Sequence, residues 1–425
     1  MEEVDDSTAA LTRYARSMHR QRLIYLGVVA LVVVALAVGV SIAWSHGEVA
    51  NTTLHTVPKA PSSLAIGSPT QSPQVAWRTS DRAAIGTPQR GGTVVVYSNR
   101  TVRGVDARTG AQTWSYTRTN RTVCSAAQIA GTTIAIYELH GNCDEVTALD
   151  SGTGTRKWTR TLDFDGQPLN GHPTYQMLSY TLMITSPSVI YALDPSSGYN
   201  RWTYSRYGCT IEHAALGSEG ALISQNCTNP SCGKLKFCGR GPQLLMRNGI
   251  DGTDDKSETN PDRIKWNVLG DTDIPVSADA LVSALNTTTR SLDVLDPKTG
   301  KPRGPVTISP APPALSPITA VSASGNEVIW IGGVAYAVRP NATTPDWSAA
   351  TPGPPTVVST TGEDNPTLPT ARVTVPSSDG IRILDGNTGQ TAQSFAVPPP
   401  EPGSLVYPLG NGFLVAAPSA TVAYK

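Results

Sequence analysis

From Gln74 to the C-terminus, short runs of hydrophobic residues alternate with clusters of Gly, Pro, Asn and Asp. The run Val189–Leu193, VIYAL, is representative. β-Branched and aromatic residues favour strands, whereas Gly, Pro and Asp favour turns. The pattern therefore predicts an all-β domain of many short strands over residues 74–425.

One hydrophobic segment is of a different kind. Leu23–Trp44 reads LIYLGVVALVVVALAVGVSIAW, a run of 22 residues without a charge. As a helix rising about 1.5 Å per residue it would extend about 33 Å, which exceeds a bilayer core of about 30 Å. We therefore predict a single transmembrane helix over residues 23–44.

Charges beside this segment predict its orientation. Four arginines precede it between positions 13 and 22, and positive flanks stay on the cytoplasmic side. Residues 1–22 are thus expected to be a cytoplasmic tail, and the strand-rich domain is expected outside the cytoplasm of a cell-membrane protein. A cleaved signal peptide ending near Ser41-Ile42-Ala43 is the alternative, although its apolar core would exceed the usual length of about 7–15 residues.

A linker is predicted between this helix and the strands. Residues 45–73 are rich in Ser, Thr, Pro and Ala and lack a strong hydrophobic period. Such a composition is typical of a flexible or extended tether.

A repeat runs through the predicted strands. In three copies, Asp is followed by Gly four positions later and by Trp eight positions later, and the copies are 44 residues apart. They are Asp106, Gly110 and Trp114; Asp150, Gly154 and Trp158; and Asp194, Gly198 and Trp202. Each copy predicts a β-hairpin in which Asp bonds turn amides, Gly adopts positive φ and Trp packs between sheets.

Weaker copies continue the repeat. Asp296 and Gly300 recur with Gly304 at the Trp position, and Asp385 and Gly389 recur with Gln393 there. Trp347 keeps the offset of eight from Arg339, and a copy from Asn248 to Trp266 has a longer turn.

The two ends of the repeat region complement each other. Gln74–Trp77 matches the strand that follows the turn, and Thr421–Lys425 matches the strand that precedes it. Pairing them would close a ring and remove exposed sheet edges. Seven internal turns and this composite one predict an eight-bladed β-propeller. Seven blades is the alternative if the degenerate fourth copy is an insertion.

The string A-L-D-x-x-[TS]-G-x-x-x-W resembles the repeat of propellers of the pyrroloquinoline-quinone (PQQ) type. That family includes quinoprotein alcohol dehydrogenases and BamB-like outer-membrane assembly proteins. The resemblance covers residues 74–425 and is most specific in the first three copies. It implies an eight-bladed fold and leaves the function open, because scaffolds and enzymes share this fold.

Six cysteines lie between Cys124 and Cys238, an even number that suits disulfides in an oxidising compartment. The alignment of the repeats places two of the cysteine pairs at the start of a blade's first strand and at the end of its second strand. Antiparallel pairing brings these two strand ends together. The predicted pairs are Cys124–Cys143, Cys209–Cys227 and Cys232–Cys238. A metal site from Cys227, Cys232 and Cys238 is the alternative, although zinc sites use tighter spacings.

Catalytic motifs are not apparent in the sequence. The resembled quinoproteins hold a cofactor and calcium in the channel and carry an adjacent Cys-Cys pair, which this sequence lacks. The repeated Asp residues are explained by their turns. We therefore expect no enzyme activity, no cofactor and no catalytic metal. The acidic segment 251–262 stays open as a calcium loop, although it lacks the Gly and the final Glu of an EF-hand.

The balance of charge excludes one class of partner. Lys and Arg together equal Asp and Glu, 33 of each, whereas nucleic-acid binders carry a basic excess.

Proline-rich links indicate another class of partner. Pro310–Pro313, Pro352–Pro355 and Pro398–Pro400 fall in equivalent links between blades and should cluster on the face that carries the longer disulfides. These prolines either only stiffen the links or form part of a protein-binding face. We expect a non-catalytic, membrane-anchored scaffold with a protein partner in envelope assembly. A sensor of a small ligand or wall component is the alternative, and a quinone-dependent dehydrogenase a third.

Overall fold

The structure is a computed structural model, and its contacts divide the chain into two compact units. One unit is Met1–Thr53 with Arg118–Asn120, and the other is Leu54–Thr117 with Arg121–Lys425. The residues that the structure describes are 25–39, 47–64, 69, 72–86, 92–129, 131–139, 141–164, 167–169, 173–178, 181–228, 239–247, 264–269, 273–279, 281–309, 318–323, 325–358 and 372–425.

The first unit contains a helix over residues 25–39, whose side chains are exposed. Within the described residues, no helix combines the length and the apolar character that crossing a membrane requires. The prediction of a single-pass anchor over residues 23–44, with a cytoplasmic N-terminus and an extracytoplasmic propeller, is therefore wrong.

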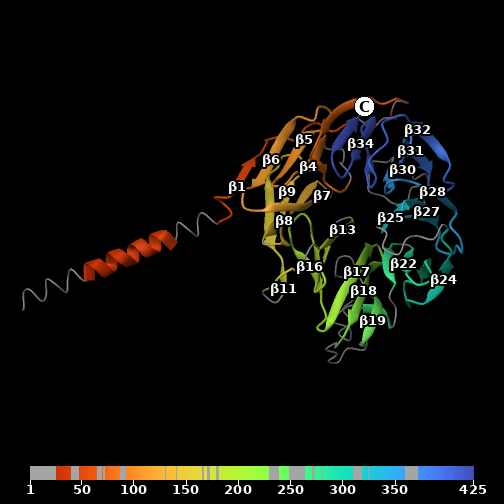
Figure 1. Cartoon of the computed structure of the whole chain (residues 1–425), viewed down its shortest axis with the longest axis horizontal. Coiled ribbons are helices and arrows are strands. Elements are labelled where there is room, and N and C mark those ends of the chain that lie inside the picture. Colours follow the sequence, from red (N-terminus) through yellow and green to blue (C-terminus); the bar gives the residue numbers. More distant parts are fainter. Residues whose placement is uncertain are drawn as a thin grey trace, which may run out of the picture. The chain divides into compact units, whose positions relative to one another are not determined.

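The second unit is a ring of antiparallel sheets, which Figure 1 shows as successive blades. The first four blades, each given in chain order, are β3 (Arg82–Ala83), β4 (Thr93–Tyr97), β5 (Thr101–Asp106) and β6 (Gln112–Arg118); β7 (Thr122–Ile129), β8 (Thr132–Leu139), β9 (Asn142–Asp150) and β10 (Arg156–Thr161); β13 (Thr174–Leu178), β14 (Thr181–Thr185), β15 (Ile190–Leu193) and β16 (Asn200–Tyr204); and β17 (Cys209–Gly217), β18 (Gly220–Cys227), β19 (Gly241–Arg247) and β20 (Ile264–Leu269). The sheet order also places β1 (Thr52–His55) at the edge of the first blade, and a small hairpin, β11 (Asp163–Phe164) with β12 (Gln167–Pro168), follows the second.

The remaining four blades continue the ring. They are β21 (Ile274–Ala278), β22 (Val282–Asn286), β23 (Ser291–Leu295) and β24 (Pro302–Val306); β25 (Ile318–Ala323), β26 (Asn326–Ile331), β27 (Val334–Val338) and β28 (Trp347–Ala350); β29 (Thr356–Val358), β30 (Arg372–Ser377), β31 (Gly380–Asp385) and β32 (Thr391–Phe395); and β33 (Leu405–Leu409), β34 (Gly412–Ala416), β35 (Thr421–Tyr424) and β2 (Val75–Thr79). The degenerate fourth copy is a complete blade, so the protein has eight blades, as predicted, and not seven.

The eighth blade is closed by strands from opposite ends of the sequence. β2 pairs antiparallel with β35, with Val75 opposite Tyr424 and Thr79 opposite Thr421. Gln74 and Lys425 exchange two backbone hydrogen bonds of 2.9 Å at the end of this ladder. The predicted closure is therefore confirmed.

Each repeated Asp organises its own turn. Asp150 Oδ1 accepts hydrogen bonds from the backbone amides of Gly152 and Thr153, and Gly154 donates its amide to the Asp150 carbonyl. The same pattern recurs at Asp106, Asp194, Asp296 and Asp385. Burial opposes ionisation of Asp194, but hydrogen bonds from Ser196 and Ser197 outweigh it and lower its pKa to about 2.

The repeated Trp of one blade packs on the turn of the next. Trp114 is fully buried, and its Nε1 donates to the Ser151 carbonyl at 2.9 Å. Gly154 has φ +75°, and a Cβ there would lie 2.6 Å from the Trp114 ring. Gly is thus required at this position for two reasons: the backbone is left-handed, and a Cβ would clash with the indole. The same contact joins Trp77 to Gly110, Trp158 to Gly198, Trp266 to Gly300 and Trp347 to Gly389.

Loss of the Trp coincides with loss of the Gly in the next turn. Gly304 stands at the Trp position of the fifth blade, and the turn of the sixth blade between Arg339 and Trp347 contains no glycine. Gln393 stands at the Trp position of the seventh blade. The eighth blade has no Asp turn between its third and fourth strands, because β35 and β2 are not consecutive in the sequence. Trp and Gly therefore occur as a pair across each blade interface where both are described.

The hydrophobic core lies between blades. The described residues form eight buried clusters, each contributed mainly by two neighbouring blades. Trp114, Tyr116 and Val102 of the first blade, for example, share one cluster with Ala135 and Tyr137 of the second. Because each core needs two blades, the sheets are expected to depend on their neighbours for stability.

Trp114→Ala should lower the free energy of unfolding by about 3–5 kcal/mol, because it removes a fully buried indole and leaves a cavity between the first two blades. Urea unfolding followed by intrinsic fluorescence and circular dichroism measures this loss. Trp158 is only half-buried, so Trp158→Ala should cost less. A cost for Trp114→Ala below about 1 kcal/mol would contradict the role given to this contact.

Candidate functional site

Antiparallel pairing gives the ring two distinct faces. In each blade, the first strand begins, the second ends, the third begins and the fourth ends at one face, which carries the links between blades. We call it the link face. The opposite face carries the Asp turns, and we call it the turn face. The Cys209 and Cys227 ends of β17 and β18, which are register partners, lie at the link face.

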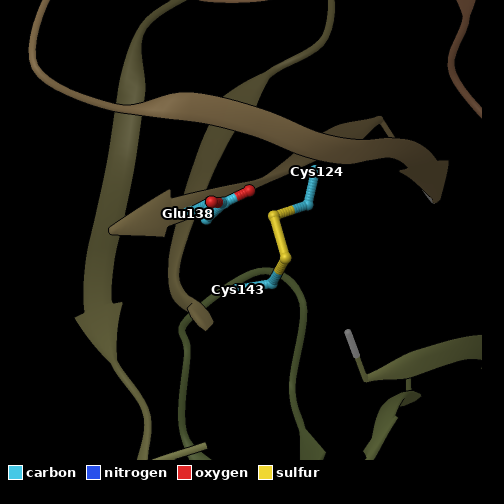
Figure 2. A group of neighbouring side chains, drawn as sticks. All are labelled: Cys124, Glu138 and Cys143. Atoms are coloured by element: carbon cyan, nitrogen blue, oxygen red, sulfur yellow. A yellow bond between two sulfur atoms is a disulfide. The ribbon is translucent and has the colours of Figure 1, made fainter. Parts of the chain in front are cut away.

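The first disulfide, Cys124–Cys143, crosses the second blade (Figure 2). Cys124 lies near the start of β7, at a register shift between Val123 and Ser125. Cys143 lies at the start of β9 and not at the end of the second strand, where the repeat had placed it. β8 continues to Leu139, so the chain has already turned before it reaches Cys143. The bond therefore joins the first and third strands across β8.

The second disulfide, Cys209–Cys227, joins adjacent strands. The two residues face each other as the first register pair of β17 and β18, which is the geometry expected from the repeat. The structure thus contains both of the longer pairings. Cys232, Cys238 and the acidic segment 251–262 lie outside the described residues, and so does the alternative metal site that includes them.

Glu138 adds an ionisable group to the first disulfide. It is the ladder partner of Cys143, and its side chain points toward the disulfide in Figure 2. One carboxylate oxygen and the two Sγ atoms all lie within 4.8 Å of one another. Glu138 and Cys124 are half-buried and Cys143 is buried. In this state both sulfurs are used by the disulfide.

A buried ion cluster anchors the link before the second blade. Arg121 Nε lies 3.1 Å from Glu145 Oε2, and its Nη1 lies 3.9 Å from Asp144 Oδ1. Both carboxylates belong to β9 and are buried. Burial raises the pKa of Tyr175, on β13 of the next blade, and the charge of Asp144 adds to the rise. These ion pairs join the residue that precedes β7 to the beginning of β9 on the link face.

The described proline-rich links contact each other. Gly403, in the link that contains Pro398–Pro400, donates its backbone amide to the Pro352 carbonyl at 2.8 Å. Most of Pro352–Pro355 is buried. The links between the last blades are therefore packed segments on the link face, whereas Pro310–Pro313 lies outside the described residues.

Two tyrosines project from opposite faces of the third blade and its links. Tyr207 is 79% exposed and lies on the link face, two residues before Cys209. Tyr199 is 71% exposed and lies in the Asp194 turn on the turn face. Both are large aromatic surfaces in water. Only Tyr207 is beside a disulfide, which limits the movement of its backbone.

A buried carboxylate lies on the turn face between the fifth and sixth blades. Glu327, 3% exposed, accepts hydrogen bonds from Ser277 at 3.0 Å and from Ser322 at 3.1 Å. Ser322 also donates to Asp279 at 3.3 Å, so two carboxylates share one hydroxyl. Burial raises the pKa of Glu327 to about 7, and the charge of Asp279 contributes.

The repeat residues do not come together in one site. Each Asp and Gly forms its own turn, and each Trp packs on the next blade, so they are distributed around the ring. The residues that sequence reasoning missed are Glu138, Arg121 and Glu327. Glu327 could have been noticed as a lone charge in the apolar strand NEVIWI. Glu138 and Arg121 carry no such pattern.

Part of the chain matches a protein-family model. Residues 71–226 match the family model described as outer membrane protein assembly factor BamB. This stretch contains the closing strand β2, the first three blades and half of the fourth. The predicted resemblance to PQQ-type, BamB-like repeats is thereby confirmed over residues 71–226. A search of curated protein sequences finds no match.

Solved structures resemble this chain at low sequence identity. A computationally designed protein, Ika8, is 12% identical, with a TM-score of 0.50 over 84% of this chain and 100% of its own. BamB from Moraxella catarrhalis is 13% identical, with a TM-score of 0.47 over 83% and 99%. Quinohemoprotein alcohol dehydrogenase ADHIIG from Pseudomonas putida HK5 is 14% identical, with a TM-score of 0.45 over 83% and 76%. Such likeness concerns the fold alone.

Replacing both Cys124 and Cys143 by Ser should lower the free energy of unfolding by about 3 kcal/mol, because the bond closes a loop of 19 residues in the unfolded chain. Urea unfolding under non-reducing conditions measures this change. An unchanged unfolding midpoint would show that the bond does not constrain the unfolded chain.

Glu327 should make stability fall as the pH rises from about 4.5 to about 7. Over this interval the folded protein keeps a proton on Glu327 that the unfolded chain has released, so the stabilisation present below pH 4.5 is lost by pH 7. The loss corresponds to about 3 kcal/mol. Glu327→Gln should remove this part of the pH dependence in urea unfolding. An identical slope for both proteins would contradict the assignment.

Proposed function

We propose that this protein is a non-catalytic scaffold that binds a protein partner on its link face during assembly of the cell envelope. The observation that carries the proposal is Tyr207, an exposed aromatic side chain beside the Cys209–Cys227 disulfide. Aromatic residues are enriched among the side chains that dominate binding energy. A rigid backbone lowers the entropy that such a residue loses on binding.

The family match supports an assembly role. The matched family model is described as an outer membrane protein assembly factor, and its match ends one residue before Cys227. Tyr207 therefore lies within the matched stretch. The described role of the family supports envelope assembly as the process in which this protein acts.

The hydrogen bonds of the repeated aspartates support a non-catalytic role. The aspartates of the described repeats accept amide hydrogen bonds in their own turns, which accounts for their presence. The sequence has no adjacent Cys-Cys pair of the kind that the resembled quinoproteins carry over their cofactor.

A second candidate function rests on a cavity at the seam of the ring. The cavity, of about 570 Å³, lies between the eighth and first blades on the turn face. Apolar side chains including Leu64 and Ala76 line it, together with Arg108, Asn411 and Lys425. Its size and mixed lining suit a small ligand with an apolar body and an anionic group.

A photo-crosslinking amino acid at position 207 tests the scaffold proposal, with position 199 as the matched control on the opposite face. Protein-sized adducts are expected from position 207 and not from 199. In the same cells, Tyr207→Ala should weaken co-purification of the crosslinked protein about 30-fold, the effect of an interface residue worth about 2 kcal/mol. Tyr199→Ala should leave it unchanged.

Equal crosslinking from both positions, or none, would count against the link face as the binding surface. Loss of a small-molecule-induced rise in melting temperature on Arg108→Ala would instead support the seam cavity.

A further inference from the structure

Cys124, Cys143 and Glu138 together offer three atoms of the kind that bind metals. Two of these atoms, the sulfurs, are joined in the first disulfide. Two sulfurs and a carboxylate oxygen lie within 4.8 Å of one another (Figure 2). The backbone fixes their positions: Glu138 and Cys143 are ladder partners on adjacent strands, and Cys124 is held in the register shift of β7. The donors therefore stay close together whether or not the sulfurs are bonded.

The distances suit zinc once the disulfide is reduced. Thiolates bind zinc at about 2.3 Å and carboxylates at about 2.0–2.2 Å, so two tetrahedral thiolate ligands lie about 3.8 Å apart. The Cα atoms of Cys124 and Cys143 are 6.2 Å apart, which lets the sulfurs separate to that distance by side-chain rotation alone. Glu138 and Cys124 are half-buried, so water can take the fourth position.

The second disulfide provides an internal comparison. Cys209–Cys227 has a shorter Cα separation of 3.9 Å. In the described part of the chain, no Asp, Glu or His joins its sulfurs in a group of metal-binding geometry. The acidic ligand thus distinguishes the first disulfide from the second.

We propose that Cys124, Cys143 and Glu138 form a zinc site that becomes able to bind the metal when the Cys124–Cys143 disulfide is reduced. A dithiol reductant supplies two electrons and two protons, the sulfur–sulfur bond breaks, and the reductant becomes a disulfide. Zinc then displaces the two thiol protons and binds both thiolates and the Glu138 carboxylate. Because disulfide and zinc use the same sulfurs, each state excludes the other, and zinc favours reduction of this bond.

Cobalt(II) reports on the site because thiolate ligation gives it an intense near-ultraviolet charge-transfer band. The tested protein has Cys209, Cys227, Cys232 and Cys238 replaced by Ser, which leaves one possible dithiol. After reduction by a phosphine, this variant should bind one cobalt per chain with that band, and zinc should displace it. The oxidised variant should show no band.

Glu138→Gln in this background should weaken cobalt binding at least about tenfold, since the loss of a ligand costs no less than the loss of an outer-shell partner. Glu212→Gln, an exposed carboxylate on β17, is the matched control and should leave the affinity unchanged. Equal affinity of the Glu138→Gln variant would overturn the assignment of Glu138.

A second arm covers the case in which the four-serine variant does not fold. Reduced wild-type protein is compared with the Cys124→Ser and Cys143→Ser double variant, which should bind one cobalt fewer per chain. Identical stoichiometry would overturn the proposal. Loss of the β-sheet circular dichroism on reduction of the wild type would overturn it as well, because the site needs strands β7, β8 and β9 in place.

Discussion

The contact between the indole of one blade and the turn of the next is the interaction on which the ring depends. Trp114 fills the space above Gly154, and its Nε1 satisfies the Ser151 carbonyl. The turn can approach the indole only because Gly has no Cβ, and it keeps its shape because Asp150 binds its amides. Packing, backbone conformation and hydrogen bonding thus meet in one unit that is repeated around the ring.

The two faces of the ring carry different features. The turn face is occupied by the Asp turns, whose side chains and amides are largely used in their own hydrogen bonds. The link face carries the disulfides, the packed proline links and the exposed Tyr207. A surface whose backbone is already constrained loses less entropy when a partner binds. The same asymmetry follows from the antiparallel order of strands in each blade.

The two disulfides show how the same blade architecture places different side chains around cysteine pairs at equivalent edges. Cys209–Cys227 ties a register pair on adjacent strands, whereas Cys124–Cys143 spans a strand and places Glu138 beside the sulfurs. The difference arises from the register shift in β7 and from the length of β8, which moves Cys143 beyond the turn. Small changes of register therefore decide which side chains meet.

Local sequence determined much of the fold. The spacing of Asp, Gly and Trp specified the hairpins, and complementary half-repeats at Gln74–Trp77 and Thr421–Lys425 specified eight blades and their closure. Both follow from short-range backbone rules and from the need to pair every sheet edge. Hydrophobicity alone did not establish a membrane span, because no helix among the described residues is long and apolar enough to cross a bilayer. Only the tertiary structure decided that Cys143 starts the third strand, that Glu138 lies beside it, that Arg121 meets Asp144 and Glu145, and that Glu327 shares Ser322 with Asp279. These contacts join different strands or blades, and their geometry depends on register shifts and blade packing that no local pattern encodes.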